Sequence, residues 1–391
     1  MISVSEAQTL VIKYAEKLPV CNIELENSLG YFLAEDCVAP ISLPSFRQSA
    51  MDGYAFINTG DTHLKVIGQV QAGDSITPQV KSGEAIRIFT GAPLPDGADT
   101  VVIQEHVNRD GDSIHIEKLP ALGANVRPIA EQLKAGTTVL KTGHKINEAS
   151  IGFMAGLGLT HIKANQKPRI CILTTGNELQ KRGTVLKPNH IYESNGIMLE
   201  TALKRLGVFD TQIVKVEDSL SQTIDAVHNA LKSADILLVS GGISVGDFDF
   251  VREAFQQNEI EEHFYKVNQK PGKPLWFGSK GSKSVFGLPG NPASSLSCFY
   301  AYVLPHIQKR SGSLNPFLEK RTAFLTEKIK NIHSKTLFLK AGVYNNEITP
   351  FTGQASSMLN TFANSNALLI VPEQIEDLEI GDSVSYLDLN Y

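Results

Sequence analysis

The spacing of hydrophobic positions changes twice along the chain. From residue 60 to 145, short runs of Val, Ile and Thr are interrupted about every ten residues by turn signals such as QAGDS and PDGAD. This spacing is typical of short antiparallel strands in a barrel or sandwich. From about residue 313 onward the turn-rich pattern returns in "TPFTGQ" and "IGDSV", which predicts a second, small β-domain.

Between residues 167 and 310 apolar runs alternate with amphipathic segments. "PRICILTTG" and "ADILLVSGG" are apolar runs that end in glycine, and "GIMLETALKRLG" and "LSQTIDAVHNALKSA" have helical spacing. This order predicts a doubly wound α/β domain whose parallel sheet carries helices on both faces. The predicted fold class is therefore α/β plus β, with several domains.

Two further helices are expected outside this domain. Ser3 and Glu6 can form a capping box, and Ala7, Leu10 and Val11 follow at helical spacing. The segment 149–164, "ASIGFMAGLGLTHIKA", predicts a glycine-interrupted helix that joins the first β-region to the α/β domain.

Composition narrows the class of protein. A chain of 391 residues is expected to form two to four domains. Its net charge of −5 gives no overall attraction to nucleic acid or anionic membranes, and no apolar run has the length of a membrane span. The four cysteines are scattered, which argues against a zinc site and favours a reducing cytoplasm.

The glycines that follow the two apolar runs are candidate ligand-binding loops. Ligands of open α/β sheets bind beyond the carboxyl ends of the strands, and glycines there let backbone N–H groups approach a phosphate. The loops are TTGNEL and SGGISVGDFDF, and their carboxylates could hold a divalent metal. A glycine after a strand is also the usual residue of a plain turn.

A third loop, GLPGNPASS, precedes another helix. Asn291 stands at a natural N-cap position and Pro292 at the first helical position. The helix N-terminus is either an anion site or simply a well-capped buried helix, and the pattern leaves both open.

Lysines cluster in "KVNQKPGKP", which lies between the second and third loops. Lys266, Lys270 and Lys273 flank a Pro-Gly turn, and alone they would indicate a solvated surface turn. Because lysine suits phosphate as a compact point charge, we hypothesise that the three neutralise a multiply charged anion at the same edge of the sheet.

Two stretches near the N-terminus are not explained by the predicted strands and helices. "PSFRQSAMDGYAF" contains Asp52 and "IFTGAPLPDGADTVVIQE" contains Thr90. Each alone would indicate a turn.

In this order, SAMDGYA, FTGAPLPDGADTVV, TGNEL, SGGISVGDFDF, KPGKP and GLPGNPASS resemble the motifs of the molybdopterin molybdenumtransferase family. That family includes the bacterial MoeA proteins and the E domain of gephyrin, and the resemblance spans essentially the whole chain. It implies an enzyme that inserts molybdenum from molybdate into adenylylated molybdopterin and releases AMP, with Mg²⁺ as cofactor.

The resemblance also implies an organisation. An elongated, discontinuous domain I comprises 1–45 and 143–166, a β-rich domain II 46–142, an α/β domain III 167–312 and a β-barrel domain IV 313–391. It implies a homodimer whose active site combines domain III of one subunit with domain II of the other. Molybdopterin adenylyltransferase and cofactor-receiving oxidoreductases are candidate partners.

Roles for individual residues follow from the motifs. Catalytic roles are implied for Asp52, Glu178, Asp249, Lys266 and Lys270, and Glu178 and Asp249 are the implied metal ligands. Roles in binding the substrates are implied for a larger set: Thr90, Thr175, Gly176, Ser240, Gly241, Gly242, Lys273, Pro289, Asn291, Pro292, Lys335 and Ser356.

The chain departs from the family pattern at several positions. "RPIAEQL" has Ala130 and Gln132 where the family usually has Gly and Asp, so one charge is lost. "SKTLFLK" has Lys335 and Lys340 in place of arginines, which keeps the charge but loses the bidentate fork. In "ASSMLNTF", Ser356 and Ser357 both compete for the position of the family's serine.

Two other functions compete with molybdenum insertion. The first is adenylylation of molybdopterin, which uses a related α/β domain but needs far fewer residues. The second is a non-catalytic pterin-binding or scaffold protein. Molybdate and tungstate are nearly isosteric, and the sequence does not separate them.

Overall fold

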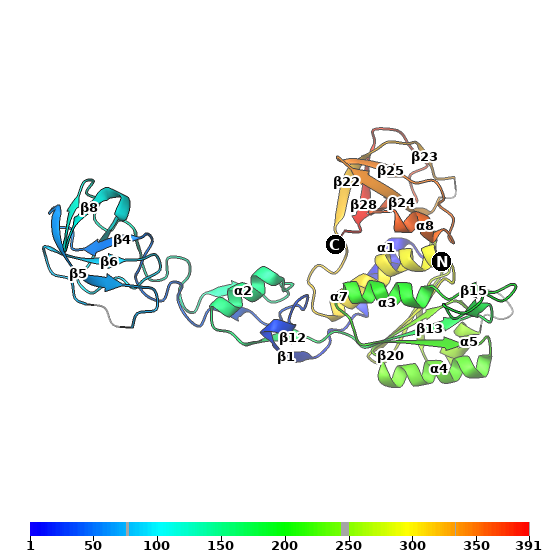
Figure 1. Cartoon of the computed structure of the whole chain (residues 1–391). Helices are drawn as coiled ribbons and strands as arrows, with labels where there is room; N and C mark the ends of the chain where they lie inside the picture. Colours follow the sequence, from blue (N-terminus) through cyan, green and yellow to red (C-terminus); the bar gives the residue numbers. More distant parts are fainter. Residues whose placement is uncertain (76–77, 244–249, 333, 391) are drawn as a thin grey trace. The chain divides into compact units, whose positions relative to one another are not determined.

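The computed structural model describes residues 1–75, 78–243, 250–332 and 334–390 (Figure 1). The chain divides into two compact units, which are described separately below. The larger contains Met1–Glu35, Thr142–Ile151 and His161–Tyr391, and the smaller contains Asp36–Lys141 and Gly152–Thr160.

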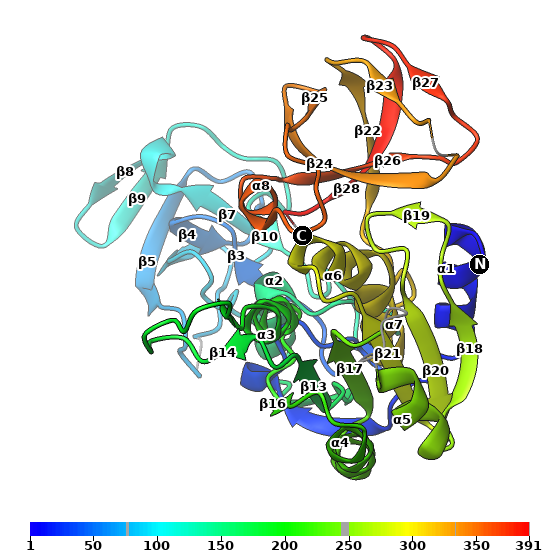
Figure 2. The same cartoon turned by 90° about the vertical axis from the view of Figure 1, so that its right-hand side faces the viewer.

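A six-stranded sheet in the order β16-β13-β17-β21-β20-β18 is central to the larger unit (Figure 2). Four strands run parallel to one another: β16 (Thr211–Val216), β13 (Ile170–Thr175), β17 (Ile236–Ser240) and β21 (Lys283–Leu288). The edge is an antiparallel addition that the sequence pattern did not indicate: β20 (Trp276–Lys280) and β18 (Glu261–Tyr265). Every residue of β13 and β17 is buried, because helices cover both faces.

Alternate residues of each strand enter different cores. Ile170 and Ile172 of β13 pack in one core, whereas Cys171 and Leu173 pack in the other. The second core is covered by α4 (Leu220–Ser233) and α5 (Val251–Gln257). The first is covered by α1 (Val4–Lys13), α3 (Asn195–Arg205), α6 (Pro292–Cys298), the π-helix η3 (Phe299–Val303) and α7 (Leu304–Arg310). The predicted doubly wound domain is confirmed, as is the capping box of Ser3 and Glu6 at α1.

The C-terminal residues form the predicted barrel. Its strands close in a ring through the pairing of β24 with β26. The ring consists of β24 (Thr336–Tyr344), β25 (Glu347–Pro350), β22 (Lys320–Leu325), β28 (Ser383–Asp388) and β26 (Ala367–Val371). Shorter elements accompany it: β23 (Ile329–Lys330), α8 (Leu359–Ala363) and β27 (Asp377–Leu378). Phe338, Leu368 and Leu387 of the barrel belong to the first core of the α/β domain.

The smaller unit is β-rich, as predicted. Its six-stranded sheet has the order β7-β4-β6-β5-β9-β8. The strands are β7 (Thr100–Ile103), β4 (Gly53–Phe56), β6 (Glu84–Ile88), β5 (His63–Val70), β9 (Ser113–Ile116) and β8 (Val107–Asp110). Two short pairs complete it: β3 (Gln48–Ser49) with β10 (Val126–Arg127), and β2 (Cys37–Val38) with β11 (Thr138–Leu140). Short 3-10 helices occur at η1 (Leu25–Asn27) in the larger unit and η2 (Gln104–His106) in this one.

The helix expected over 149–164 is only half right. The helix α2 (Glu148–Gly156) stops because Gly158 takes a φ of +78° and the amide of Leu159 donates back to the carbonyl of Met154 at 3.1 Å. After a short turn, the chain forms β12 (His161–Asn165), which pairs antiparallel with β1 (Val20–Glu24). In "HIKAN" exposed and buried residues alternate over the first four positions, which favours a strand over a helix because a strand buries every second side chain.

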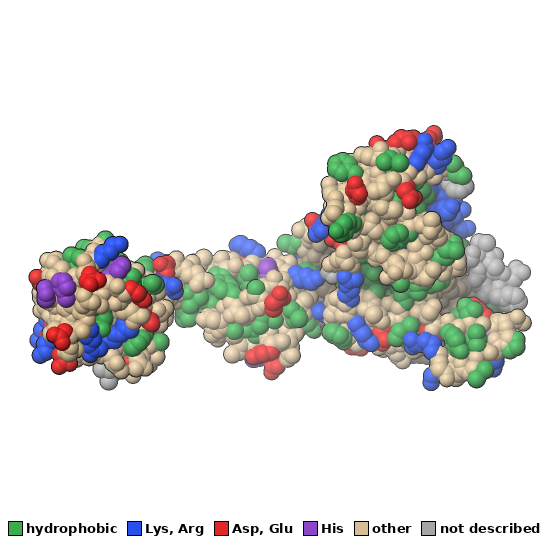
Figure 3. Space-filling view, turned by 45° about the horizontal axis from the view of Figure 1, so that its top comes forward, with side chains coloured by type: hydrophobic (Ala, Val, Ile, Leu, Met, Phe, Trp, Pro, Cys, Tyr) green, Lys and Arg blue, Asp and Glu red, His purple; other side chains and the backbone are tan. Residues whose placement is uncertain are grey.

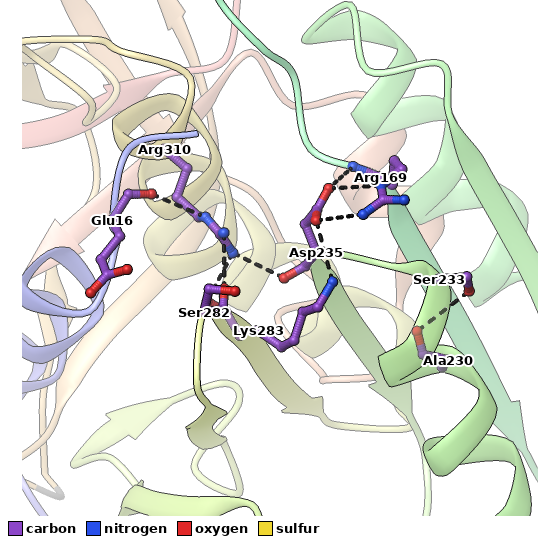
Figure 4. A network of polar contacts seen from close by, with 9 residues as sticks. Glu16, Arg169, Ala230, Ser233, Asp235, Ser282, Lys283 and Arg310 are labelled. Atoms are coloured by element: carbon purple, nitrogen blue, oxygen red, sulfur yellow. Dashed lines mark hydrogen bonds and ion pairs between the residues drawn. The ribbon is translucent and has the colours of Figure 1, made fainter. Parts of the chain in front are cut away.

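A buried arginine joins the amino ends of the parallel strands (Figure 4). Arg310 is 3% exposed, and its guanidinium donates to the carbonyls of Glu16, Asp235 and Ser282 at 3.2, 2.9 and 3.0 Å. It also donates to the Ser284 hydroxyl at 3.2 Å. These acceptors come from three separate parts of the chain, so one side chain ties the segment after α1 and the starts of β17 and β21 to α7.

Two ionisable groups support this network. Burial lowers the pKa of His306 to about 3, although Nδ1 donates to the Val11 carbonyl, so the imidazole is neutral. Partial burial raises the pKa of Asp235, but hydrogen bonds from Arg169 and the charges of Arg169 and Lys283 outweigh this effect and lower it to about 2. Asp235 is therefore a carboxylate at neutral pH.

Arg310→Met should lower the free energy of unfolding by about 3 kcal/mol or more, because each buried acceptor that loses its donor costs about 1–3 kcal/mol. The chain has one tryptophan, Trp276, which is 2% exposed within this domain. Its fluorescence during urea denaturation measures the effect. Lys309→Met, on the same helix, is the control and should stay within about 0.5 kcal/mol; equal effects of both substitutions would contradict the role of Arg310.

The family's usual glycine is replaced at a position that favours glycine. Ala130 has a φ of +64°, and its amide donates to the carbonyl of Pro44 at 3.0 Å. A side chain in this left-handed region is strained. The substitution noted in the sequence therefore stores strain in the smaller unit.

Ala130→Gly should stabilise the smaller unit by about 1 kcal/mol, because relief of the strain exceeds the extra entropy of glycine in the unfolded chain. Scanning calorimetry measures the shift in melting temperature. Ala135→Gly is the comparison, since Ala135 is exposed and has no positive φ, and it should not stabilise. A lower melting temperature for Ala130→Gly would contradict the strain.

Candidate functional site

A cavity of about 670 Å³ lies at the carboxyl edge of the parallel sheet. The loops after β13, β17 and β21 form its walls, as expected for strands whose carboxyl ends meet at one edge. The cavity brings together much of the predicted set: Thr175, Gly176, Glu178, Ser240, Gly241, Gly242, Pro289, Asn291 and Pro292.

The paired glycines after β17 are required by close packing. Gly241 has a φ of +98°, and a Cβ there would lie 2.8 Å from the carbonyl oxygen of Thr175. At Gly242, with a φ of +61°, a Cβ would lie 2.7 Å from a methyl carbon of Val251. The hydroxyls of Thr174 and Thr175 are buried and have no hydrogen-bond partner among the described residues. The strand ends are therefore both tightly packed and polar.

Carboxylates dominate the charge of the cavity wall. Glu178, Glu193 and Asp218 line it, and the described lining residues include no lysine or arginine. A Cβ on Gly176 would lie 2.8 Å from both carboxylate oxygens of Glu178, so this side chain folds back over its own turn. An anionic ligand in this cavity needs cations from elsewhere.

Asp218 is a cavity residue that the sequence analysis missed. Its carboxylate accepts a hydrogen bond from the amide of Asn177 at 2.9 Å, and its own amide donates to the side chain of Asn177 at 3.1 Å. Asp218 follows β16, so the rule about carboxyl ends would have found it. The sequence analysis did not identify β16 because this strand does not end in glycine.

A two-stranded flap and a bridging asparagine complete the walls. The flap pairs β14 (Leu179–Gln180) with β15 (Ile191–Tyr192), and Tyr192 donates its hydroxyl to the carbonyl of Thr184 at 2.7 Å. Asn195 donates to the Ser240 hydroxyl at 2.8 Å and to the Gly290 carbonyl at 2.7 Å. It therefore ties the second loop to the third, which no local motif indicated.

The third loop resolves the alternatives that its sequence left open. Asn291 is the N-cap of α6, and the amides of Ala293 and Ser294 donate to the carbonyl of Ser356 at 3.1 and 3.3 Å. Asn291 also donates to the Ser356 hydroxyl at 3.0 Å. The helix is thus capped by the barrel, and these two amides are not available to an anion. Ser356 contacts the loop, while Ser357 lines the cavity.

The lysine loop borders the cavity without lining it. Of its residues only Pro274 is part of the wall, whereas Lys270 and Lys273 are exposed. Lys266 is half-buried, and its Nζ lies 4.7 Å from the centre of the Tyr265 ring. Among the described residues, these three lysines are therefore not part of the cavity wall, and their role as anion ligands stays a prediction.

The loop has a rigid back. Gln269 is 1% exposed, donates to the carbonyl of Gly272 at 2.9 Å, and accepts a hydrogen bond from the hydroxyl of Tyr302. A Cβ on Gly272 would lie 2.6 Å from the sulfur of Cys298. The turn is fixed from inside, and its ammonium groups remain on the outside.

The two lysines that replace family arginines have different environments. The short strand β19 (Gln269–Lys270) pairs parallel with β24, with Gln269 opposite Thr336. The half-buried Lys335 directly precedes Thr336 and therefore lies next to the lysine loop. Lys340 is 1% exposed and cannot face a soluble oxyanion.

Asp52 and Thr90 belong to the smaller unit and contact each other. Oδ1 of Asp52 accepts from the amide of Thr90 at 2.7 Å and from its hydroxyl at 2.9 Å. These hydrogen bonds lower the pKa of Asp52, and the bond from the Thr90 amide has the larger effect. A Cβ on Gly53 would lie 1.8 Å from the carbonyl oxygen of Val102, which explains the glycine after this aspartate. Two motifs that looked like separate turns form one site.

The donor set bears on the implied metal. The described residues hold no group of three His, Cys, Asp or Glu side chains that could form a complete metal site. Mg²⁺ usually takes one or two carboxylates together with substrate phosphates and water, so Glu178 and Asp218 suit it. The other predicted ligand, Asp249, lies outside the described residues.

The face drawn in Figure 3 carries side chains of both charges, and basic and acidic side chains are interspersed over it. Within the described ranges, no helix is long and apolar enough to cross a bilayer.

Comparison with known proteins covers nearly the whole chain. Residues 2–158 match the MoeA N-terminal region (domain I and II), residues 171–309 a probable molybdopterin binding domain, and residues 322–389 the MoeA C-terminal region (domain IV).

Curated relatives and a crystal structure agree. Molybdopterin molybdenumtransferase 2 of Mycobacterium tuberculosis is 32% identical over 405 residues, covering 100% of both chains. Molybdopterin molybdenumtransferase of Staphylococcus epidermidis is 32% identical over 402 residues, covering 99% of this chain and 95% of the relative. The molybdopterin biosynthesis MoeA protein from Pyrococcus horikoshii OT3 matches with a TM-score of 0.85 and 27% identity, covering 99% of this chain and 100% of that one. The chain therefore belongs to the MoeA family of molybdopterin molybdenumtransferases.

Proposed function

We propose that this chain transfers molybdenum from molybdate to adenylylated molybdopterin and releases AMP. One observation carries the proposal: in a chain that matches the MoeA regions throughout, three strand-end loops enclose a polar cavity of about 670 Å³. That volume suits a ligand of nucleotide size. Adenylylation of molybdopterin is less favoured, because it leaves the N-terminal region and the barrel without a role.

The protein's share of the chemistry is mainly positioning. The backbone at Gly241 and Gly242 can approach a phosphate closely, because no side chain intervenes. The exposed Lys270 and Lys273, with Lys335 beside them, supply the positive charge that the acidic cavity wall does not. In this proposal they hold molybdate next to the dithiolene of molybdopterin. Because both reactants are then bound side by side, the reaction no longer depends on the encounter of two anions in solution.

The proposal includes Mg²⁺ held by Glu178 and Asp218, with Asp249 as a further candidate ligand. When bound, the ion would neutralise phosphate charge and polarise the phosphoanhydride. Glu178 and Asp218 would then be shielded from the anionic substrate, which the bare carboxylates would repel.

Asp52 and Thr90 enter the proposal through a homodimer. The hydrogen bonds from Thr90 keep Asp52 ionised and fix its direction, as a residue that acts on a substrate requires. We propose that this pair acts on substrate held by the α/β domain of the other subunit.

Cellular context completes the proposal. We infer a cytoplasmic protein without nucleic-acid partners, supported by the net charge of −5 and by four free cysteines. Molybdopterin adenylyltransferase would supply its substrate, and molybdenum oxidoreductases would receive its product.

Lys270→Ala should reduce molybdate-dependent AMP release from adenylylated molybdopterin by about 100-fold, because the loss of one preorganised charge contact costs about that much. Release is measured with Mg²⁺, in the presence and absence of molybdate. Lys320→Ala, an exposed lysine of the barrel, is the matched control and should keep full activity.

Other outcomes favour other functions. AMP incorporation from ATP into molybdopterin, without release, would support adenylylation. Tight pterin binding without either reaction would support a binding or scaffold protein.

The shared site makes a quantitative prediction. Asp52→Ala and Lys270→Ala should each have very little activity, yet random mixed dimers of the two should recover about one quarter of wild-type activity, since half are heterodimers with one intact site. Activity is measured after the two chains are expressed together, with dimer composition checked by mass spectrometry. No recovery in verified heterodimers would place both residues at one site within a single chain.

A further inference from the structure

The ammonium of Lys340 is buried among backbone carbonyls. Its Nζ donates to the carbonyls of Gly353, Ala355 and Met358 at 2.9, 3.1 and 3.1 Å. A lysine ammonium has three donors, so all of its hydrogen-bonding capacity is used. No ion pair joins it to a carboxylate within the described residues.

All three acceptors belong to one segment, residues 351–358, which we call the serine strap. The strap also bonds to the backbone of Lys340. The amide of Phe351 donates to the Lys340 carbonyl at 3.0 Å, and the side chain of Gln354 accepts from the Lys340 amide at 3.0 Å and donates to its carbonyl at 2.8 Å. An irregular segment is thus wrapped around one charged side chain, which replaces the missing strand partners.

The strap reaches the cavity directly. The Ser356 carbonyl accepts from the amides of Ala293 and Ser294, its hydroxyl accepts from Asn291, and Ser357 is part of the cavity wall. Hydrogen bonds therefore join Lys340 to the strap, and others join the strap to the third cavity loop.

The same strand supports the lysine loop. Thr336 and Leu337, at the start of β24, pair with Gln269 and Lys270, and Lys340 follows three residues after Leu337. The loop that carries the cations and the strap that caps α6 are thus anchored on one strand. No local motif indicates these contacts of β24, because β24 lies far in sequence from the lysine loop and from the third cavity loop.

We propose that Lys340 is a positioning residue that, through its three carbonyl contacts, holds the serine strap against the cavity and sets the affinity for the pterin substrate. This inference rests on the proposed function for its substrate. Its structural part does not. The residue does not touch substrate, and its charge serves the strap instead of the molybdate.

Hydrogen exchange of the ligand-free chain tests the structural part. Lys340→Met keeps an unbranched side chain, one atom shorter, but removes all three donors, and the amides of Ala293 and Ser294 should then exchange at least about 10-fold faster. The amides of β17 should exchange at the wild-type rate. Lys340→Gln, which keeps two donors, should fall between, and it serves if Lys340→Met does not fold. Lys320→Met controls for loss of a barrel lysine.

Kinetics test the functional part. Lys340→Met and Lys340→Gln should raise KM for adenylylated molybdopterin by about 10-fold with kcat nearly unchanged, as expected when binding in the ground and transition states is lost equally. Lys340→Arg keeps the charge and several donors, and it should restore both the exchange protection and KM.

The outcomes separate this inference from the proposed function. Unchanged exchange at Ala293 and Ser294 in a folded Lys340→Gln protein would overturn the structural part. Faster exchange with an unchanged KM would overturn the link to the substrate. Absence of AMP release from the wild-type chain would instead refute the proposed function, and the exchange result would still decide whether Lys340 holds the strap.

Discussion

The buried guanidinium of Arg310 fixes one end of the sheet and thereby leaves the other end free. Three of its four acceptors precede or begin β17 and β21, while Arg169 and Asp235 join the starts of β13 and β17. All these groups lie at the amino ends of the strands. This network lies opposite the cavity, whose wall contains several carboxylates and the buried hydroxyls of Thr174 and Thr175, which have no partner among the described residues.

This division explains why the cavity depends on distant segments for what its own loops lack. The strand-end loops provide glycines, hydroxyls and carboxylates, but no positive charge in the described wall. Cations stand on the neighbouring turn, which Gln269 and Tyr302 hold from inside. The barrel contributes Ser357 and the cap on α6. The site is an assembly of separately anchored parts, and each anchor is buried.

The sequence predicts most of the fold and, within the site, the loops that follow β13 and β17. Apolar runs that end in glycine identified β13 and β17, and both loops line the cavity. Local pattern failed where a long-range contact decides the outcome. The lysine loop pairs with β24, and the amides at the start of α6 are capped by Ser356. Likewise the sequence showed Lys340 only as a replacement for a family arginine, whereas its side chain is buried against the strap.

The core shared by the barrel and the α/β domain has a consequence for how such chains can be rearranged. Phe338, Leu368 and Leu387 pack with Leu288, Phe299 and Tyr302 in one apolar cluster. Residues in one close-packed cluster gain and lose their order together. The barrel is thus a poor candidate for exchange between proteins by gene fusion, since a recombined partner would have to match this apolar surface residue by residue.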